Sequence, residues 1–131
     1  MNLTDLYYIK SYELIEKYVY SAKIDINPNH PLFNGHFPGQ PVMPGVCLTA
    51  IITDFISKIK KTAYFLNSAD YIKFLNLVIP NQTKQFEVNL KELSDKDNLL
   101  IIEAIIKKED LNFLKLKGTF KRLSDNVYKN L

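Results

Sequence analysis

Residues 18–27 alternate between apolar and polar side chains, a period of two that predicts a strand with one face buried. The aromatic-rich residues 6–16 precede this segment. We expect them to form a second strand, which pairs with the first through a turn at Glu16 and Lys17. The chain therefore starts with a strand pair.

The pattern changes between Gly45 and about Lys61, where apolar side chains leave almost no polar face until a group of lysines at the end. A helix that is apolar nearly all round is a buried helix. Pro44 suits the first turn and the lysines suit the last. We expect one buried helix here, preceded by a loop over residues 27–45, which carry turn chemistry.

Four later segments alternate or are rich in β-branched residues, as strands are. They are residues 71–79, 85–91, 99–107 and 114–121. Clusters of turn residues separate the last three, as antiparallel hairpins require. Two strands, one helix and four strands predict an α+β fold, in which an antiparallel sheet wraps around a single central helix.

Composition narrows the function only slightly. The length of 131 residues predicts one domain, 1–131, and the net charge of +3 with Arg122 as the sole arginine argues against nucleic-acid binding. The single cysteine, Cys47, cannot form a disulfide within the chain and is expected to be a small buried side chain. The longest apolar run is too short and polar to span a bilayer, and the first residues do not form a signal peptide. We expect a cytoplasmic protein that binds no membrane.

The loop over residues 35–45, GHFPGQPVMPG, carries the candidate chemistry. It holds three of the 6 prolines and three of the 4 glycines of the chain. Glycine permits positive φ or close approach of another backbone, and proline fixes φ. We expect a rigid loop that directs His36 and presents the helix start at Pro44 and Gly45 to a ligand.

This GHFPG-x-P-x-x-PG loop, between a strand pair and a buried helix, resembles the loop of the hotdog-fold β-hydroxyacyl-ACP dehydratases. Residues 71–80 resemble the strand that follows the helix in that family. The family removes water from (3R)-3-hydroxyacyl thioesters in bacterial fatty-acid synthesis. The resemblance implies a hotdog fold, a curled antiparallel sheet around one long buried helix, with acyl carrier protein as substrate carrier and no cofactor.

The resemblance also implies catalytic roles. His36 matches the catalytic histidine, and an imidazole suits removal of the Cα proton. The amide of Gly45 matches the group that receives the thioester carbonyl, a task that suits the free N–H groups of a helix N-terminus. Apolar walls suit an acyl chain. Candidates for such walls are Phe33, Phe37, Val46 and Tyr71.

The family places an acid in the helix at the position that Ala50 occupies here. One interpretation makes Asp54, one turn further on the same face, the substitute through a bridging water, although Asp54 can instead pair with Lys58. A second is a composite site, whose acid comes from a paralogue in a heterodimer. A third is another task on the same scaffold, a hotdog thioesterase or a non-catalytic acyl-thioester binder.

Some further side chains have a structural and a functional interpretation. We expect His30 to be a surface loop histidine, and His30 with His36 lacks a third ligand for a metal. Thr49 and Thr53 can hold a water near Ala50 or bond back to helix carbonyls.

The expected partners follow from charge and exposed surface. Four lysines either meet an acidic acyl carrier protein or form a solvated face. They are Lys58, Lys60, Lys61 and Lys73. A lone hotdog domain leaves an exposed strand edge and an apolar helix face, so we expect a homodimer, a heterodimer with a paralogue, or a higher oligomer.

Overall fold

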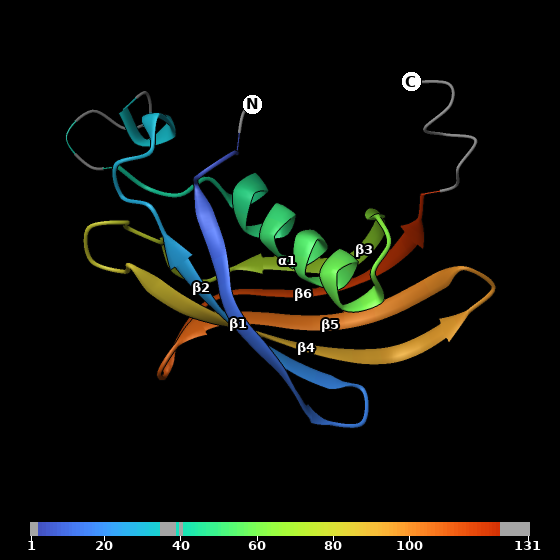
Figure 1. Cartoon of the computed structure of the whole chain (residues 1–131). Helices are drawn as coiled ribbons and strands as arrows, with labels where there is room; N and C mark the ends of the chain where they lie inside the picture. The colour runs from blue at the N-terminus through green and yellow to red at the C-terminus, as the bar shows by residue number, and fades with distance from the viewer. Residues whose placement is uncertain (1–2, 35–38, 40, 124–131) are drawn as a thin grey trace.

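The computed structural model describes residues 3–34, 39 and 41–123 (Figure 1). Its elements, in chain order, are β1 (Tyr7–Glu16), β2 (Val19–Ile26), the short 3₁₀ helix η1 (Pro31–Asn34), α1 (Gly45–Lys60), β3 (Tyr64–Phe74), β4 (Gln85–Lys96), β5 (Leu99–Lys108) and β6 (Leu111–Arg122). The strands form one antiparallel sheet in the order β1-β2-β4-β5-β6-β3. The sheet curls, and α1 lies in its hollow. The expected α+β architecture is confirmed.

The helix forms where the apolar run predicted it. Pro44, with φ −61° and ψ 146°, is its extended N-cap, and Lys61 ends it in the left-handed region, where its N–H donates to the Ser57 carbonyl. The side chains that α1 buries are Cys47, Leu48, Ile51, Ile52, Phe55 and Ile56. They join the sheet's inward side chains in one core cluster. This burial fixes α1 against the sheet, because each such large side chain removed from water stabilises the fold by roughly 1.5–3 kcal/mol.

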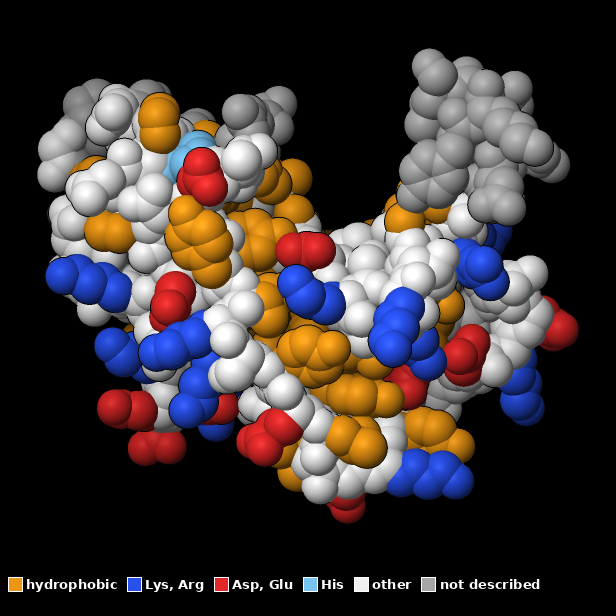
Figure 2. Space-filling model, in the orientation of Figure 1, with side chains coloured by type: hydrophobic (Ala, Val, Ile, Leu, Met, Phe, Trp, Pro, Cys, Tyr) orange, Lys and Arg blue, Asp and Glu red, His pale blue; other side chains and the backbone are white. Residues whose placement is uncertain are grey.

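The strand pair at the start of the chain is also confirmed. On β2 the alternate residues Ala22, Ile24 and Ile26 are buried, as the period of two predicted. The turn lies at Lys17 and Tyr18, one residue later than expected, with Tyr18 at a φ of 69°. The outer strand β1 keeps large hydrophobic side chains exposed, and Figure 2 shows orange side chains gathered on the face that carries β1 and α1.

The strand predicted over residues 71–79 is misplaced. The observed β3 begins at Tyr64 and ends at Phe74, which pairs with Leu114 of β6. Beyond that pair the chain turns away, and the Asn76 amide bonds to the Asn112 carbonyl at 2.7 Å. The largely apolar residues 75–79 continue past the end of the ladder, and an apolar run alone does not show where the pairing with β6 stops.

His30 is buried, with 7% of its surface exposed, so the expectation of a surface histidine is wrong. Its Nδ1 accepts a hydrogen bond from the Leu32 N–H at 3.0 Å, and its Nε2 lies 2.9 Å from the Thr4 carbonyl oxygen. The first contact places the proton on Nε2, which therefore donates to Thr4. The histidine thus ties the segment before β1 to the loop before η1, a long-range contact that local turn chemistry does not predict.

Candidate active site

The face of α1 that the sheet does not cover borders an open groove of about 400 Å³. Small or hydroxyl-bearing helix side chains form one wall, and the start of β3 forms the other. The lining residues are Val46, Thr49, Ala50, Thr53, Asp54, Ser57, Tyr64, Phe65 and Leu66. Small side chains on the helix give the groove its depth, so Ala50 faces open space and not the core.

The first turn of α1 opens at one end of this groove. N–H groups at a helix start have no intrahelical acceptor. Here the Cys47 N–H donates to the Pro44 carbonyl at 3.0 Å, and Pro44 offers no side-chain cap. Val46, 60% exposed, follows Gly45 into the groove wall. A ligand carbonyl at the Gly45 amide would therefore sit at the mouth of the groove.

The glycine at this turn has a close neighbour. A Cβ built on Gly45 would lie 2.5 Å from Cε1 of Phe74, in the last position of β3. That separation is shorter than real side-chain contacts allow. The Phe74 ring, 58% exposed, therefore lies directly over the start of the helix.

The hydroxyl groups beside Ala50 bond back to the helix. Thr49 Oγ1 donates to the Val46 carbonyl at 2.9 Å, and Thr53 Oγ1 donates to the Thr49 carbonyl at 3.0 Å. The structure thus shows the structural interpretation of these threonines, in which their hydroxyl groups bond back to helix carbonyls. Their protons are used, so toward a water or substrate they can only accept hydrogen bonds.

Asp54 shares the groove with Ala50, and its carboxylate is held by a tyrosine. The Tyr7 hydroxyl donates to Asp54 Oδ2 at 2.8 Å. No ion pair among the described residues joins Asp54 to Lys58, so the expected alternative, a pair between these two side chains, is not present there. Burial first, and then the hydrogen bond and charge of Asp54, raise the pKa of Tyr7 well above its ordinary 10.0. The phenol therefore keeps its proton and acts as a donor.

Sequence reasoning missed Tyr7, because 47 positions separate it from Asp54 and only the packing of β1 beside α1 brings them together. His36 and Phe37 lie outside the described residues. Phe33 is 3% exposed and belongs to the core cluster. Tyr71 is half-buried on β3, with the Lys73 ammonium 4.7 Å from its ring centre. Their roles toward an acyl chain remain predictions.

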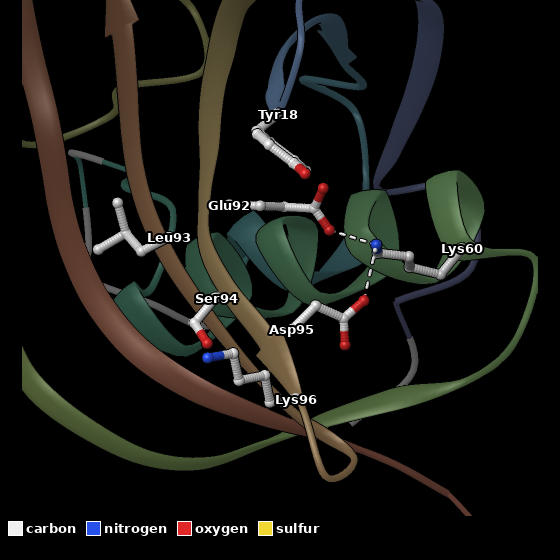
Figure 3. A pocket seen from close by; sticks show the side chains of 7 residues that line it. All are labelled: Tyr18, Lys60, Glu92, Leu93, Ser94, Asp95 and Lys96. Carbon is white, nitrogen blue, oxygen red and sulfur yellow. Dashed lines mark hydrogen bonds and ion pairs between the residues drawn. The ribbon is translucent and has the colours of Figure 1, made fainter.

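A second hollow, of about 380 Å³, lies at the far end of α1 (Figure 3). Lys60 reaches across it to the buried carboxylate of Glu92 and, at 3.2 Å, to Asp95 Oδ2. Burial by itself would lower the pKa of the Lys60 ammonium, but the two carboxylates outweigh burial and raise it. The ion pair joins the end of α1 to β4 and so has a structural role. Lys58, Lys61 and Lys73 are exposed and do not line this hollow.

Cys47 is fully buried, as expected, and burial raises the pKa of its thiol. Within the part of the chain that the structure describes, no three His, Cys, Asp or Glu side chains gather as a metal site. None of the described helices is long and apolar enough to cross a membrane. Among the described residues, the groups that the groove offers for chemistry are the Gly45 amide at its mouth and the Asp54 carboxylate on its wall.

A curled sheet around one helix, with a groove along the helix, is the architecture of the hotdog proteins, and solved structures share it. The Dehydratase Heterocomplex ApeI:P from Xenorhabdus doucetiae matches with a TM-score of 0.68 and 20% identity, over 88% of this chain and 97% of that one. A putative thioesterase from Lactococcus lactis matches with a TM-score of 0.64 and 14% identity, over 95% of this chain and 99% of that one. At these identities the likeness shows the fold, and it confirms the expected hotdog class.

The ApeI-like family model, described as ApeI dehydratase, matches residues 13–110. The chain belongs to the ApeI-like dehydratase family, which confirms the resemblance seen in the sequence. The matched range contains the 35–45 loop, Ala50 and Asp54, but it does not contain Tyr7.

Curated relatives are 3-hydroxyacyl-[acyl-carrier-protein] dehydratases FabZ. The protein from Ligilactobacillus salivarius is 39% identical over 88 residues, 60% of this chain and 61% of that protein. The protein from Bordetella petrii is 36% identical over 83 residues, 53% of this chain and 55% of that protein. The chain thus spans about six tenths of the length of the curated relatives it matches.

Proposed function

We propose that this chain removes water from (3R)-3-hydroxyacyl thioesters carried by an acyl carrier protein. Membership of the ApeI-like family and the names of the FabZ relatives support this activity. The observation that carries the proposal is the uncapped start of α1 at Gly45, which opens into a groove with the Asp54 carboxylate on its wall. A carbonyl site and a carboxylate along one helix suit elimination next to a thioester.

In this mechanism the Gly45 N–H donates to the thioester carbonyl oxygen and stabilises the negative charge that develops there. His36 takes the Cα proton. The electron pair left on Cα forms the double bond to Cβ as the bond from Cβ to the hydroxyl breaks. A water held by Asp54 protonates the departing hydroxyl and becomes a hydroxide. The imidazolium of His36 then gives its proton to this hydroxide, which restores the water and the neutral histidine. The products are a 2-enoyl thioester and one water.

Ala50 leaves the space that such a bridging water needs. The methyl group cannot donate a proton, and Asp54 stands one turn along the helix, about 6 Å further along its axis. Because Asp54 and Ala50 line the same groove, a water beside the Ala50 methyl can reach the carboxylate.

Incubation with (3R)-3-hydroxyacyl-ACP, followed by mass spectrometry of the carrier, tests this function. We expect the carrier to lose the mass of one water, with the acyl chain still attached. A free carrier thiol would instead identify the thioesterase. Asp54→Asn should slow the loss of water, and unchanged turnover in that variant would remove Asp54 from the mechanism.

A composite site is the second candidate, and Ala50 favours it because the family's acid is absent from the groove wall. A heterodimer with an acid-bearing paralogue would complete the site around His36, and the structural neighbour from Xenorhabdus doucetiae is itself a dehydratase heterocomplex. An inactive chain that gains turnover when such a paralogue is added would establish it. Ala50→Glu should then make the chain active alone, with Ala50→Gln as the matched uncharged control.

The open side of the groove supports a dimer. The edge strand β3 pairs only with β6 in the described sheet, and Phe74 at its end and Val46 on α1 are more than half exposed. A second chain along this edge would cover these side chains and close the groove. The exposed Lys58, Lys61 and Lys73 carry positive charges that would suit an acidic carrier protein.

A further inference from the structure

We propose that Tyr7 is a positioning residue that holds the Asp54 carboxylate in the groove and leaves its second oxygen for the water or hydroxyl of the reaction. The inference rests on the proposed function and deepens it, since it gives the displaced carboxylate a fixed place. The proposed role comes from the structure of this chain and not from the family match, because Tyr7 lies outside the range that the family model matches.

The tyrosine is well anchored. Its ring packs against the core cluster, and its backbone pairs with Ile26 of β2. The residue before it, Leu6, is fully buried, and the Leu6 carbonyl accepts the Asn27 N–H at 2.9 Å. A donor fixed at both backbone and ring loses little further freedom when it binds a carboxylate.

The carboxylate needs such an anchor. Asp54 is exposed on α1, and an exposed aspartate samples several rotamers. The bond from Tyr7 occupies Oδ2 alone, and no bond between described residues takes Oδ1. Asp54 lines the groove and Tyr7 does not, so the phenol holds the carboxylate from outside the groove lining and leaves Oδ1 without a bond from Tyr7.

The phenol is a dependable donor at any pH at which an acyl thioester survives. Its surroundings keep it protonated, as burial and the charge of Asp54 both oppose its ionisation. A serine or a water in its place would lack the rigid ring. The pair thus offers what the sequence lacks at Ala50, a carboxylate with a defined position.

A double-mutant cycle tests the role, with Tyr7→Phe, Asp54→Asn and the double variant assayed on the same hydroxyacyl carrier. Tyr7→Phe should lower kcat by about ten- to hundredfold, with KM within about twofold, because only the placement of the carboxylate is lost. The double variant should be no slower than Asp54→Asn. Tyr8→Phe is the matched control, because that neighbouring hydroxyl bonds to Asp5 at 3.2 Å and should leave the rate unchanged.

Full kcat in Tyr7→Phe, or losses that multiply in the double variant, would overturn the role while the proposed function stands. Asp54→Glu offers a second test that keeps Tyr7, because it retains the charge but moves the carboxylate by one methylene. It should also lose kcat, and full activity would contradict positioning. A wild-type chain without turnover, alone or with an acid-bearing partner, would overturn the proposed function and this role with it.

Discussion

At the residue scale, Tyr7 shows how one hydrogen bond connects the site to stability. Its pKa is raised above 10.0, first by burial and then by Asp54. Above pH 10 the unfolded chain releases this phenolic proton while the folded chain keeps it. The folded state then binds more protons, so the free energy of unfolding falls as pH rises, and below pH 10 this contribution is fully present.

Tyr7→Phe removes that titration. We expect the stability advantage of the wild type over Tyr7→Phe to be smaller at pH 11 than at pH 8, by about 1 kcal/mol after allowance for solvent screening of a half-buried group. Urea unfolding of both proteins at the two pH values measures it. An advantage that is the same at pH 8 and pH 11 would show that the folded chain does not protect the phenol.

Gly45 makes a second prediction at this scale. In Gly45→Ala the new methyl group must displace the Phe74 ring, which can swing because it is exposed. We expect a stability cost below about 1 kcal/mol. Turnover should fall roughly tenfold, since the carbonyl site would be disturbed.

Phe74→Ala in the same chain should restore most of that turnover, because the methyl group then meets no ring. Steady-state rates of the two single variants and the double variant show whether the contact with Phe74 causes the loss of turnover. If the double variant is as slow as Gly45→Ala, the loss does not come from the contact with Phe74.

At the element scale, the periodicity of apolar residues and the geometry of a helix predicted the features that depend on residues close in sequence. The apolar run predicted α1 to within a residue, and helical geometry placed Asp54 on the same face as Ala50, which the groove confirms. The ends of β3 and the burial of His30 escaped prediction, because each depends on a partner that is distant in sequence. Tyr7 escaped for the same reason.

The junction between α1 and β4 gives a stability prediction. The Glu92 side chain is 6% exposed and the Lys60 side chain 23% exposed, so Lys60→Met leaves a buried carboxylate without its cation. We expect the free energy of unfolding to fall by about 3 kcal/mol. Asp95→Asn, which removes the exposed partner, should cost under about 1 kcal/mol.

Lys60→Met combined with Glu92→Met should recover much of that loss, since two apolar side chains leave no unpaired charge. Urea denaturation of the four proteins gives the comparison. A loss below 1 kcal/mol in Lys60→Met would mean that water reaches Glu92 and that the ion pair does not fasten the helix.

At the scale of the whole molecule, the groove is open along β3, where Val46 is 60% and Phe74 58% exposed. We expect the purified chain to sediment at twice its mass of 15.2 kDa. Val46→Asp should shift it toward the monomer without unfolding it, because the side chain is exposed in the single chain. Sedimentation velocity at micromolar concentration measures both, with Leu14→Asp on β1, at 60% exposure, as the matched control.

A wild-type chain that sediments as a monomer would contradict the homodimer and direct the search to a paralogous partner. Folding of Val46→Asp is checked by its thermal unfolding. If Leu14→Asp dissociates the dimer and Val46→Asp does not, the interface lies along β1 and the groove stays open.

The central claim is that the loop, the start of α1 and the groove together dehydrate a hydroxyacyl thioester. The most direct measurement is the rate at which (3R)-3-hydroxyacyl-ACP loses one water with the wild-type chain and with His36→Ala. We predict turnover by the wild type and a loss of at least about a hundredfold in the variant. Equal rates in the two proteins, or no turnover by the wild type even beside an acid-bearing partner, would contradict the account.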